Sequence, residues 1–169
     1  MKEYMDLVSV LIVTWNSGDY LPRCLDSVRR QNYKKIEIII IDNGSTDGAM
    51  DGIKQRYSEL NIRIKKLNTN TGFAVANNIG ARLANGKWIA LLNADAFPDP
   101  DWLANLLVAA KQYPNAFFAS RQIQAGSPNL LDGEGDTYHI SGLAWRRNYG
   151  YPLEKNHEIT EVFSPCAAA

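Results

Sequence analysis

The sequence has few cysteines, no net charge and no long apolar run, and each absence excludes a class of protein. Its two cysteines, Cys24 and Cys166, lie far apart without a Cys-x-x-Cys pair, which argues against a disulfide framework and a zinc site. Its 18 basic residues balance 18 acidic ones, so the positive field typical of nucleic-acid-binding proteins is absent. The apolar runs at 7–13 and 36–41 are much shorter than the roughly 20 residues of a membrane span.

The remaining composition is that of one globular domain. The chain has 169 residues, of which 46% are hydrophobic, and this length supports a substantial core. The runs Val8–Val13, Ile36–Ile41 and Trp88–Leu92 are nearly continuous in apolar residues, as is typical of strands buried on both faces of a parallel sheet. Two further strands are expected at residues 62–64 and 116–119.

Apolar residues at helical spacing separate these strands. The stripe Leu21, Cys24, Leu25 and Val28 is the clearest example. The helices expected from such spacing cover residues 21–28, 50–60, 76–83 and 103–110. The pair Asn85-Gly86 is expected to end the third helix with a left-handed cap, and Asp99-Pro100 to begin the fourth.

Strands that alternate with helices imply an α/β fold with a mainly parallel sheet, whose ligands bind beyond the carboxyl ends of the strands. We expect residues 1–120 to form this α/β core as a three-layer sandwich. Residues 121–169 lack periodicity and contain many Gly, Asp, Asn and Tyr residues. We expect them to form an irregular segment of the same domain, because long segments of this kind commonly act as lids or binding loops.

Polar residues follow the first two strands. The glycine fingerprint of dinucleotide-binding proteins is absent after the first strand, where Asn16 or Ser17 would cap the next helix, contact a ligand, or do both. Asp42 ends the second strand and is placed to accept the imide N–H of uracil or thymine. The sequence Asn43-Gly44 that follows is also a common turn signal, so a structural role is the alternative.

Two more segments carry candidate ligand-binding groups. Asn93-Ala94-Asp95 follows the strand at 88–92 and offers oxygen ligands to Mg²⁺ or Mn²⁺, which typically take one or two carboxylates together with substrate phosphates. The triplet alone is equally typical of a turn. In the segment Asn70–Ala74, Gly72 allows close approach of a ligand to the backbone, and the helix that follows favours anions at its N-terminus.

In combination, these segments resemble the family 2 glycosyltransferases of the GT-A fold. The resemblance covers residues 8–16, 41–47, 70–78 and 92–95 in the order and spacing of that family. It implies a GT-A (Rossmann-like) sandwich and an inverting hexosyltransferase that moves a sugar from a UDP- or dTDP-sugar to an acceptor hydroxyl. The Asn-x-Asp form is most similar to the rhamnosyltransferase-type branch, which builds bacterial surface polysaccharides.

The resemblance also implies roles for single residues. The residues expected to bind the nucleotide sugar are Thr14, Trp15, Asn16, Asp42, Asn43, Gly72, Asn78 and Asn93. Asp95 is the expected ligand of Mg²⁺ or Mn²⁺. Asn93 stands where the family's Asp-x-Asp motif has its first acid, which weakens the negative field on the metal.

The general base is the part of the family pattern that this sequence does not contain. In the family it lies in a later Glu-Asp motif that follows a Gly-Phe-Asp-Glu stretch. Residues 163–169 resemble the strand before that segment, so we expect the chain to stop short of its base, which would lie beyond Ala169, and to be inactive alone. Weaker candidates for the base are Asp132, Glu134 and Asp136, with His139 nearby; these four and His157 are more typical of loop or solvated residues.

The resemblance further implies a glycan or lipid-linked acceptor and a cytoplasmic location, extending to peripheral association with the inner face of a membrane. A nucleotide-binding module without transferase activity would keep the same pocket and is the main alternative. A nicotinamide-dependent dehydrogenase is disfavoured because glycines are missing after the first strand. A phospho-acceptor receiver domain is disfavoured because no lysine follows a late strand in the required position.

Overall fold

The computed structural model describes residues 6–153 and 159–165. His157 and Cys166 therefore lie outside the described residues. The chain divides into two compact units, one up to Ala104 and the other from Asn105 onward, and the division lies within helix α4 (Trp102–Gln112). This division is earlier in the chain than the boundary at residue 120 expected from the sequence.

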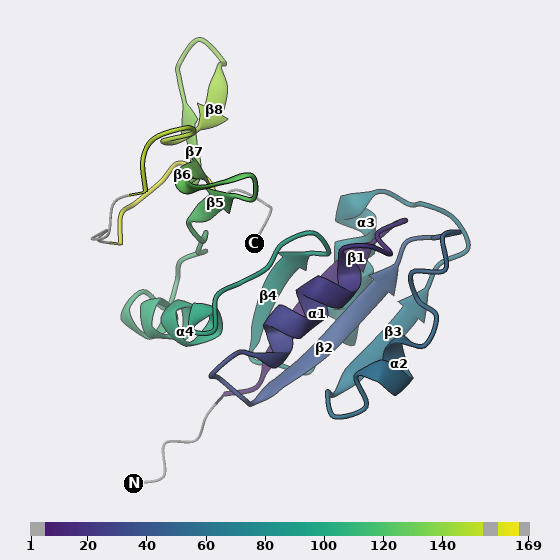
Figure 1. The fold of residues 1–169 in the computed structure, drawn as a ribbon. Coiled ribbons are helices and arrows are strands. Elements are labelled where there is room, and N and C mark those ends of the chain that lie inside the picture. Colours follow the sequence, from purple (N-terminus) through teal and green to yellow (C-terminus); the bar gives the residue numbers. More distant parts are fainter. Residues whose placement is uncertain (1–5, 154–158, 166–169) are drawn as a thin grey trace, which may run out of the picture. The chain divides into compact units, whose positions relative to one another are not determined.

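The first unit contains a four-stranded parallel sheet with helices on both faces. Its elements are β1 (Val8–Thr14), α1 (Leu21–Arg29), β2 (Ile36–Asp42), α2 (Ile53–Arg56), β3 (Ile62–Lys66), α3 (Phe73–Leu83) and β4 (Trp88–Asn93). The strand order is β3-β2-β1-β4, with α1 on one face and α3 on the other (Figure 1). The predicted α/β class with its parallel sheet is confirmed.

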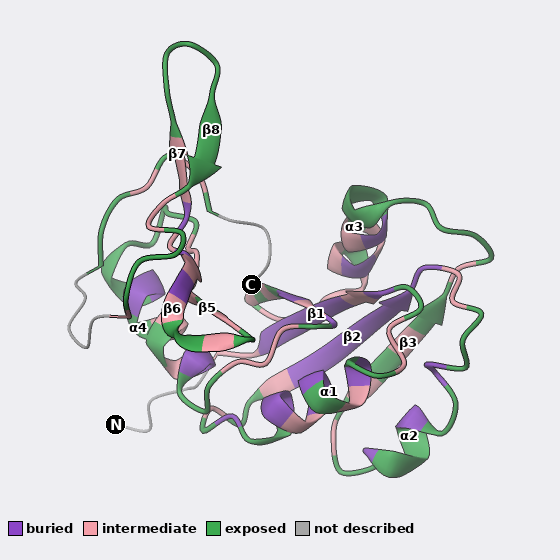
Figure 2. Ribbon diagram, turned by 45° about the horizontal axis from the view of Figure 1, so that its top comes forward, coloured by how far each residue is buried: buried purple, intermediate pink, exposed green. Residues whose placement is uncertain are grey.

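Burial explains why β1 and β2 have nearly continuous apolar sequences. Both strands lie in the centre of the sheet and are almost fully buried, as the purple strands of Figure 2 show. On one face Leu11, Ile39 and Ile41 pack with Ala76 of α3. The predicted stripe of α1 is also buried, and its residues Leu21, Cys24, Leu25 and Val28 are at most 1% exposed. Hydrophobic burial on both faces therefore stabilises the sheet.

Four local predictions differ from the structure of the first unit and of the segment that follows it. Strand β4 lies at the end of the observed strand order, and Ile89 and Leu91 are 46% and 40% exposed, so this strand is not fully buried. Helix α2 is only four residues long because the backbone before it turns at Gly48 and Gly52, both with positive φ. Residues 116–119, all of them described, form no strand.

The fourth difference is the end of α3. Its C-cap is Ala84 in an extended conformation, and Gly86 does not have a positive φ. Gly86 instead lies where two backbone segments pack closely together. A Cβ atom at this position would lie 2.6 Å from the backbone nitrogen of Ser9 and 2.9 Å from the carbonyl oxygen of Leu7. The glycine is therefore explained by a close approach of backbones rather than by a left-handed cap.

The second unit contains two antiparallel ribbons. Strands β5 (Gln122–Gln124) and β6 (Ser127–Gly133) form one ribbon, and β7 (Asp136–Tyr138) and β8 (Ala144–Arg146) form the other. The expectation that this segment is irregular is therefore wrong in part. Three of these strands have only three residues, which is too short for a hydrophobic period to be recognised. Among the described residues, no helix combines the length and apolar character required to cross a bilayer.

A buried carboxylate links β2 to the turn before β4. Glu37 is 4% exposed, and its carboxylate accepts hydrogen bonds from the Ser9 hydroxyl (2.6 Å), the Asn85 backbone N–H (2.6 Å) and the Asn85 side chain (3.0 Å). Burial raises the pKa of Glu37, but the bonds from Ser9 and Asn85 outweigh it and hold this pKa below its ordinary value. The ionised form therefore stabilises the folded state.

We expect the stability contributed by Glu37 to be lost in acid. Because the folded pKa is lowered, this contribution is complete above the unfolded pKa of about 4.3 and disappears as the pH falls through the folded value. Glu37→Gln should lower the free energy of unfolding at pH 7 by about 1–3 kcal/mol and should flatten its pH dependence below pH 5. Urea unfolding from pH 3 to 7 measures both effects, and an unchanged acid slope would contradict them.

Candidate functional site

The polar residues predicted from the sequence meet at one edge of the sheet. Thr14 of β1 pairs in register with Asp42 of β2, and Val13 of β1 pairs with Asn93 of β4. Asp42 and Asn93 therefore flank the end of β1 at two strand spacings, about 10 Å apart along the sheet. Asp95 follows in a tight turn closed by a hydrogen bond from the Ala96 N–H to the Asn93 carbonyl. The two acids Asp42 and Asp95 thus share the carboxyl edge.

Hydrogen bonds join the loop after β2 to the loop after β1. The Asn16 backbone N–H donates to Ser45 Oγ (3.0 Å), and Asn16 Oδ1 accepts from the Thr46 N–H (2.9 Å). Helix α1 has no side-chain cap, so the capping role considered for Asn16 and Ser17 is wrong. Asn16 instead has a positive φ of 49° and fastens the two loops together at the site.

The same pair of loops is joined a second time by Asp47. Its carboxylate accepts backbone N–H bonds from Ala49 (3.0 Å) and Gly18 (2.9 Å), and these bonds hold the pKa of Asp47 below its ordinary value. Asp47 therefore stays ionised and keeps the two loops in one arrangement. Trp15 directly precedes Asn16 in the first of these loops and is 53% exposed.

Asp42 itself is buried at the base of a small polar pocket. It is 4% exposed, and its Oδ1 accepts the Ser45 N–H at 2.9 Å. The pocket has a volume of about 210 Å³ and is lined by Asp42, Ser45, Thr46, Gly48, Ala49, Met50, Asp51 and Lys66. Thr14, the register partner of Asp42, is 1% exposed, and its hydroxyl has no hydrogen-bond partner within the described residues.

Lys66 is a site residue that the sequence analysis missed. It is the last residue of β3, pairs in register with Asp42 and lines the same pocket. The available signal was its position, because the last residue of any parallel strand lies at the carboxyl edge. Asp42 and Lys66 together offer a hydrogen-bond acceptor and a donor to one ligand.

Asn43 organises the loop before α3. Its Oδ1 accepts bonds from the Thr71 N–H (2.9 Å) and hydroxyl (3.0 Å), while its Nδ2 donates to Asn70 Oδ1 (2.9 Å). This side chain is 3% exposed and is therefore a positioning residue rather than a surface contact. It orders the chain that leads to Gly72, the N-cap of α3, which has a φ of 84°. Asn78, one turn and a half further along α3, is exposed.

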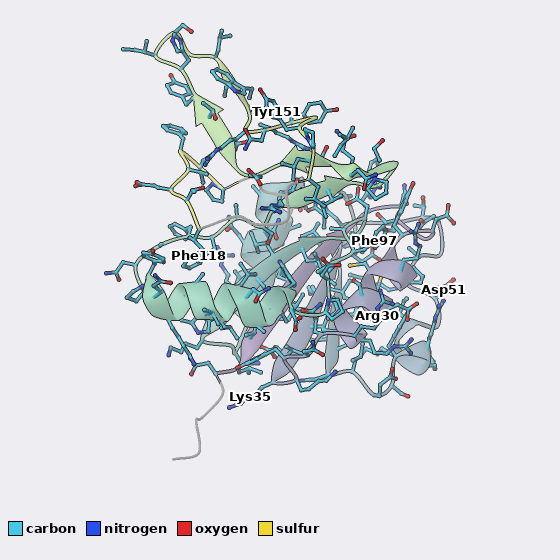
Figure 3. The ribbon with its side chains drawn as sticks, turned by 60° about the vertical axis from the view of Figure 1, so that its left-hand side comes forward. Arg30, Lys35, Asp51, Phe97, Phe118 and Tyr151 are labelled. Carbon is cyan, nitrogen blue, oxygen red and sulfur yellow. The ribbon has the colours of Figure 1, made fainter. Side chains whose placement is uncertain are left out.

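Helix α1 positions the turn that carries Asp95. The Cys24 thiol donates to the Asn93 carbonyl oxygen at 3.5 Å, and the Arg23 guanidinium lies 4.4 Å from the ring centre of Phe97. Figure 3 labels Phe97. Burial, with a smaller effect from the Asp95 charge, raises the pKa of Cys24 to about 12. This thiol is therefore a neutral structural group, and the negative charge close to it belongs to Asp95.

The residues around Asp95 fit a divalent cation that is held jointly with a ligand. Asp95 is exposed, and no described residue forms a hydrogen bond or ion pair with its carboxylate. No set of three potential ligands among His, Cys, Asp and Glu occurs in the described part of the chain. A hard cation such as Mg²⁺ suits this arrangement, since one carboxylate, substrate phosphates and waters complete its shell.

The three acids considered as general bases are engaged within the second unit. Asp132 forms an ion pair with Arg146, Glu134 contacts Arg121 (2.9 Å) and Asn148 (2.8 Å), and Asp136 accepts the Ser164 hydroxyl (2.8 Å). His139 contacts Ser141 at 2.8 Å. These carboxylates therefore serve the structure of this unit.

Comparison with solved structures defines the fold class. The chain is similar to Staphylococcus aureus TarS 1–349 in complex with UDP-GlcNAc, with a TM-score of 0.65 and 21% identity over 72% of this chain and 36% of that one. It is also similar to the mannosyltransferase PcManGT from Pyrobaculum calidifontis in complex with GDP-Man and Mn²⁺, with a TM-score of 0.59 and 26% identity over 72% and 36% of the two chains. The α/β core of this protein is thus of the GT-A type.

The chain belongs to glycosyl transferase family 2, whose family model matches residues 9–168. It is 36% identical over 111 residues to the uncharacterized glycosyltransferase YibD of Escherichia coli, a match that covers 65% of this chain and 32% of YibD. It is 34% identical over 96 residues to the chondroitin synthase of Pasteurella multocida, covering 56% of this chain and 10% of that protein. The chain spans a third or less of the length of these curated relatives.

Proposed function

We propose that this chain is the donor-binding part of an inverting glycosyltransferase that moves a sugar from a UDP- or dTDP-sugar to an acceptor hydroxyl. The observation that carries the proposal is the position of Asp42 and Asp95 on one sheet edge, separated by the end of β1. This spacing suits a nucleoside diphosphate whose base lies at Asp42 and whose phosphates lie at Asp95.

Base recognition is assigned to Asp42 and Lys66. Asp42 is proposed to accept the imide N–H of the pyrimidine through the oxygen that Ser45 does not use. The Lys66 ammonium would donate to an adjacent carbonyl oxygen of the base. Trp15, 53% exposed, supplies an aromatic surface at the same edge. Thr14 and Asn43 are buried at the ends of β1 and β2, and Asn43 orders the loop that leads to Gly72.

Phosphate binding is assigned to the segment Asn93–Asp95 and to the start of α3. A divalent cation at Asp95 would stabilise the charge that develops on the departing diphosphate. Gly72 and the first turn of α3 border the sugar diphosphate, with Asn78 on the same helix. Because Asp132, Glu134 and Asp136 are engaged elsewhere, the base that activates the acceptor hydroxyl is proposed to lie outside this sequence.

The biological setting follows from the relatives and from the Asn-x-Asp form of the motif. Chondroitin synthase, by its name, builds a polysaccharide, and the resemblance to rhamnosyltransferase-type enzymes points in the same direction. We therefore propose a role in polysaccharide or cell-envelope glycan synthesis in the cytoplasm, with a glycan or lipid-linked acceptor at the inner face of the membrane.

Calorimetric titration with UDP, dTDP and CDP, with and without Mn²⁺, tests the donor site. We expect metal-enhanced binding of UDP or dTDP and weaker binding of CDP, whose ring nitrogen N3 carries no proton to donate to Asp42. Asp42→Ala should reduce the preference for UDP over CDP by about 1–3 kcal/mol. Binding of CDP as tight as that of UDP in the unmodified chain would contradict the assignment.

Asp42→Asn separates base recognition from loop order. The asparagine Oδ1 retains the bond from the Ser45 N–H, while its NH₂ group replaces the acceptor offered to the base. This variant should lose the preference for UDP and keep the thermal stability of the unmodified chain. Asp19→Asn, an exposed acid in the neighbouring loop, is the matched control and should change neither property.

A further inference from the structure

The segment Trp145–Tyr151 of the second unit lines an open pocket. Trp145, Tyr149 and Tyr151 contribute aromatic rings to this pocket, which has a volume of about 500 Å³, and Arg146, Arg147 and Asn148 contribute polar groups. Thr137, the register partner of Trp145 on β7, belongs to the same pocket. The pocket lies entirely within residues 137–151.

Arg146, Asn148 and Gly150 bind this segment to β6 and to the residues that follow it. Arg146 forms an ion pair with Asp132, the Asn148 side chain donates to Glu134 (2.8 Å), and the Gly150 N–H donates to the Leu131 carbonyl oxygen (2.9 Å). Asn148 has a positive φ of 57° and is held there by this bond. The backbone under the pocket is therefore held in place by bonds from this segment to β6 and to Glu134.

The aromatic side chains of the pocket are largely exposed. Trp145, Tyr149 and Tyr151 are 51%, 61% and 64% exposed, and Figure 3 labels Tyr151 at the edge of the second unit. Three large rings exposed side by side on a restrained segment are unlike the scattered apolar residues of an ordinary surface. Flat aromatic faces with a few polar groups are typical of ligand-binding pockets.

Charge distinguishes the two arginines of the pocket. Arg146 is neutralised by Asp132. Arg147 donates to the Thr160 hydroxyl at 2.9 Å, and none of the described carboxylates forms an ion pair with it. Its guanidinium therefore retains a positive charge and further donors. A guanidinium of this kind binds carboxylate or phosphate oxygens in a two-pronged arrangement.

We propose that this pocket is a subsite for an anionic saccharide, with a sugar ring packed on the aromatic side chains and its carboxylate or phosphate bound by Arg147. Sugar rings present flat C–H faces that pack on aromatic rings, and the pocket combines such rings with the Arg147 guanidinium, which forms no ion pair with a carboxylate of the described residues. The inference deepens the proposed transferase function, because it identifies the chemical class of the acceptor. The anion is either the carboxylate of a uronic acid or the phosphate of a glycosyl phosphate.

Nuclear magnetic resonance titration of the chain tests the proposal through the indole N–H of Trp145, assigned by comparison with Trp145→Phe among the four tryptophans. The probes are a glucuronic-acid disaccharide, N-acetylglucosamine 1-phosphate, the neutral sugars cellobiose and N-acetylglucosamine, and inorganic phosphate. We expect at least one anionic sugar to shift the Trp145 signal and to bind about tenfold more tightly than its neutral counterpart. The tighter anionic probe identifies the anion.

Two variants separate the contributions of charge and ring. Arg147→Met should abolish the preference for the anionic sugar. Trp145→Ala should instead weaken the binding of every sugar by about tenfold. Arg30→Met, at an exposed arginine of the first unit, and Phe117→Ala, at a ring that is 93% exposed and outside the pocket, are the controls and should leave binding unchanged. A circular dichroism spectrum equal to that of the unmodified chain shows that each variant is folded.

Several outcomes would overturn the subsite. They are equal binding of neutral and anionic sugars, inorganic phosphate as effective as the sugar phosphate, and shifts that do not involve Trp145. A parallel titration with UDP and Mn²⁺ reports on the donor site alone. Loss of UDP binding with saccharide binding intact would contradict the transferase proposal, and the reverse result would contradict only the saccharide subsite.

Discussion

Replacing Asp95 with alanine is expected to abolish the metal-dependent part of nucleotide binding. Asp95 is exposed at the carboxyl edge, and no described residue neutralises its carboxylate, so it is available to a cation shared with the diphosphate. Changes to groups that only support a metal ligand already cost about 10- to 100-fold in metal affinity, and the loss of a direct ligand should cost at least as much. Titration of UDP with and without Mn²⁺ measures the difference.

The control for this variant is Glu59→Ala. Glu59 precedes β3 at the opposite edge of the sheet, and its contact with Arg29 is an exposed pair of 3.6 Å that contributes little to stability. The Glu59→Ala substitution removes one negative charge, as Asp95→Ala does, but at a position outside the proposed site. If Mn²⁺ still enhanced UDP binding in Asp95→Ala as strongly as in Glu59→Ala, Asp95 would not be the ligand.

The largest expected effect on stability is that of Gly86→Ala. The added methyl group would lie 2.6 Å from both the backbone nitrogen and the hydroxyl oxygen of Ser9. The clash is with a buried strand that cannot move aside, and it would break the bonds that connect the Gly86 N–H, Ser9 and Glu37. We expect the free energy of unfolding to fall by about 3 kcal/mol, combining overpacking with the loss of buried hydrogen bonds.

Chemical denaturation measures this loss, and Gly126→Ala is the matched control. No atom lies within 4 Å of a Cβ built at Gly126, and its φ is not in the left-handed region, so its replacement should change stability by less than about 0.5 kcal/mol. Similar losses of unfolding free energy in the two variants would show that the backbone of the turn before β4 shifts to accommodate the methyl group. This result would contradict the close packing assigned to Gly86.

The elements that carry the site could be predicted because their signals are local. The continuous apolar runs of β1 and β2 and the stripe of α1 identify buried strands and a helix packed on them. Parallel pairing then follows from the alternation of strands and helices, and it places residues such as Asp42 and Asn93 on one edge without knowledge of the register.

Other features could not be predicted because they depend on residues far apart in the sequence. Asn16 is a residue type that commonly caps helices, yet its side chain accepts a hydrogen bond from the Thr46 N–H, 30 residues away in the sequence. Gly86 has the local signature of a left-handed cap, but the nearby backbone of Ser9 determines why it is glycine. Local propensity identifies which conformations a residue tolerates, and tertiary packing selects among them.

By itself, the sequence determined the α/β class, the family resemblance and the candidate acids, since these depend on periodicity and on short motifs within single elements. Only the tertiary structure decided that Lys66 shares the pocket of Asp42, that Asn43 supports a loop, and that Trp145 and Arg147 line a common pocket. The physical reason is that strand register and side-chain partners are set by contacts between distant segments. The spacing of residues within one segment does not determine these contacts.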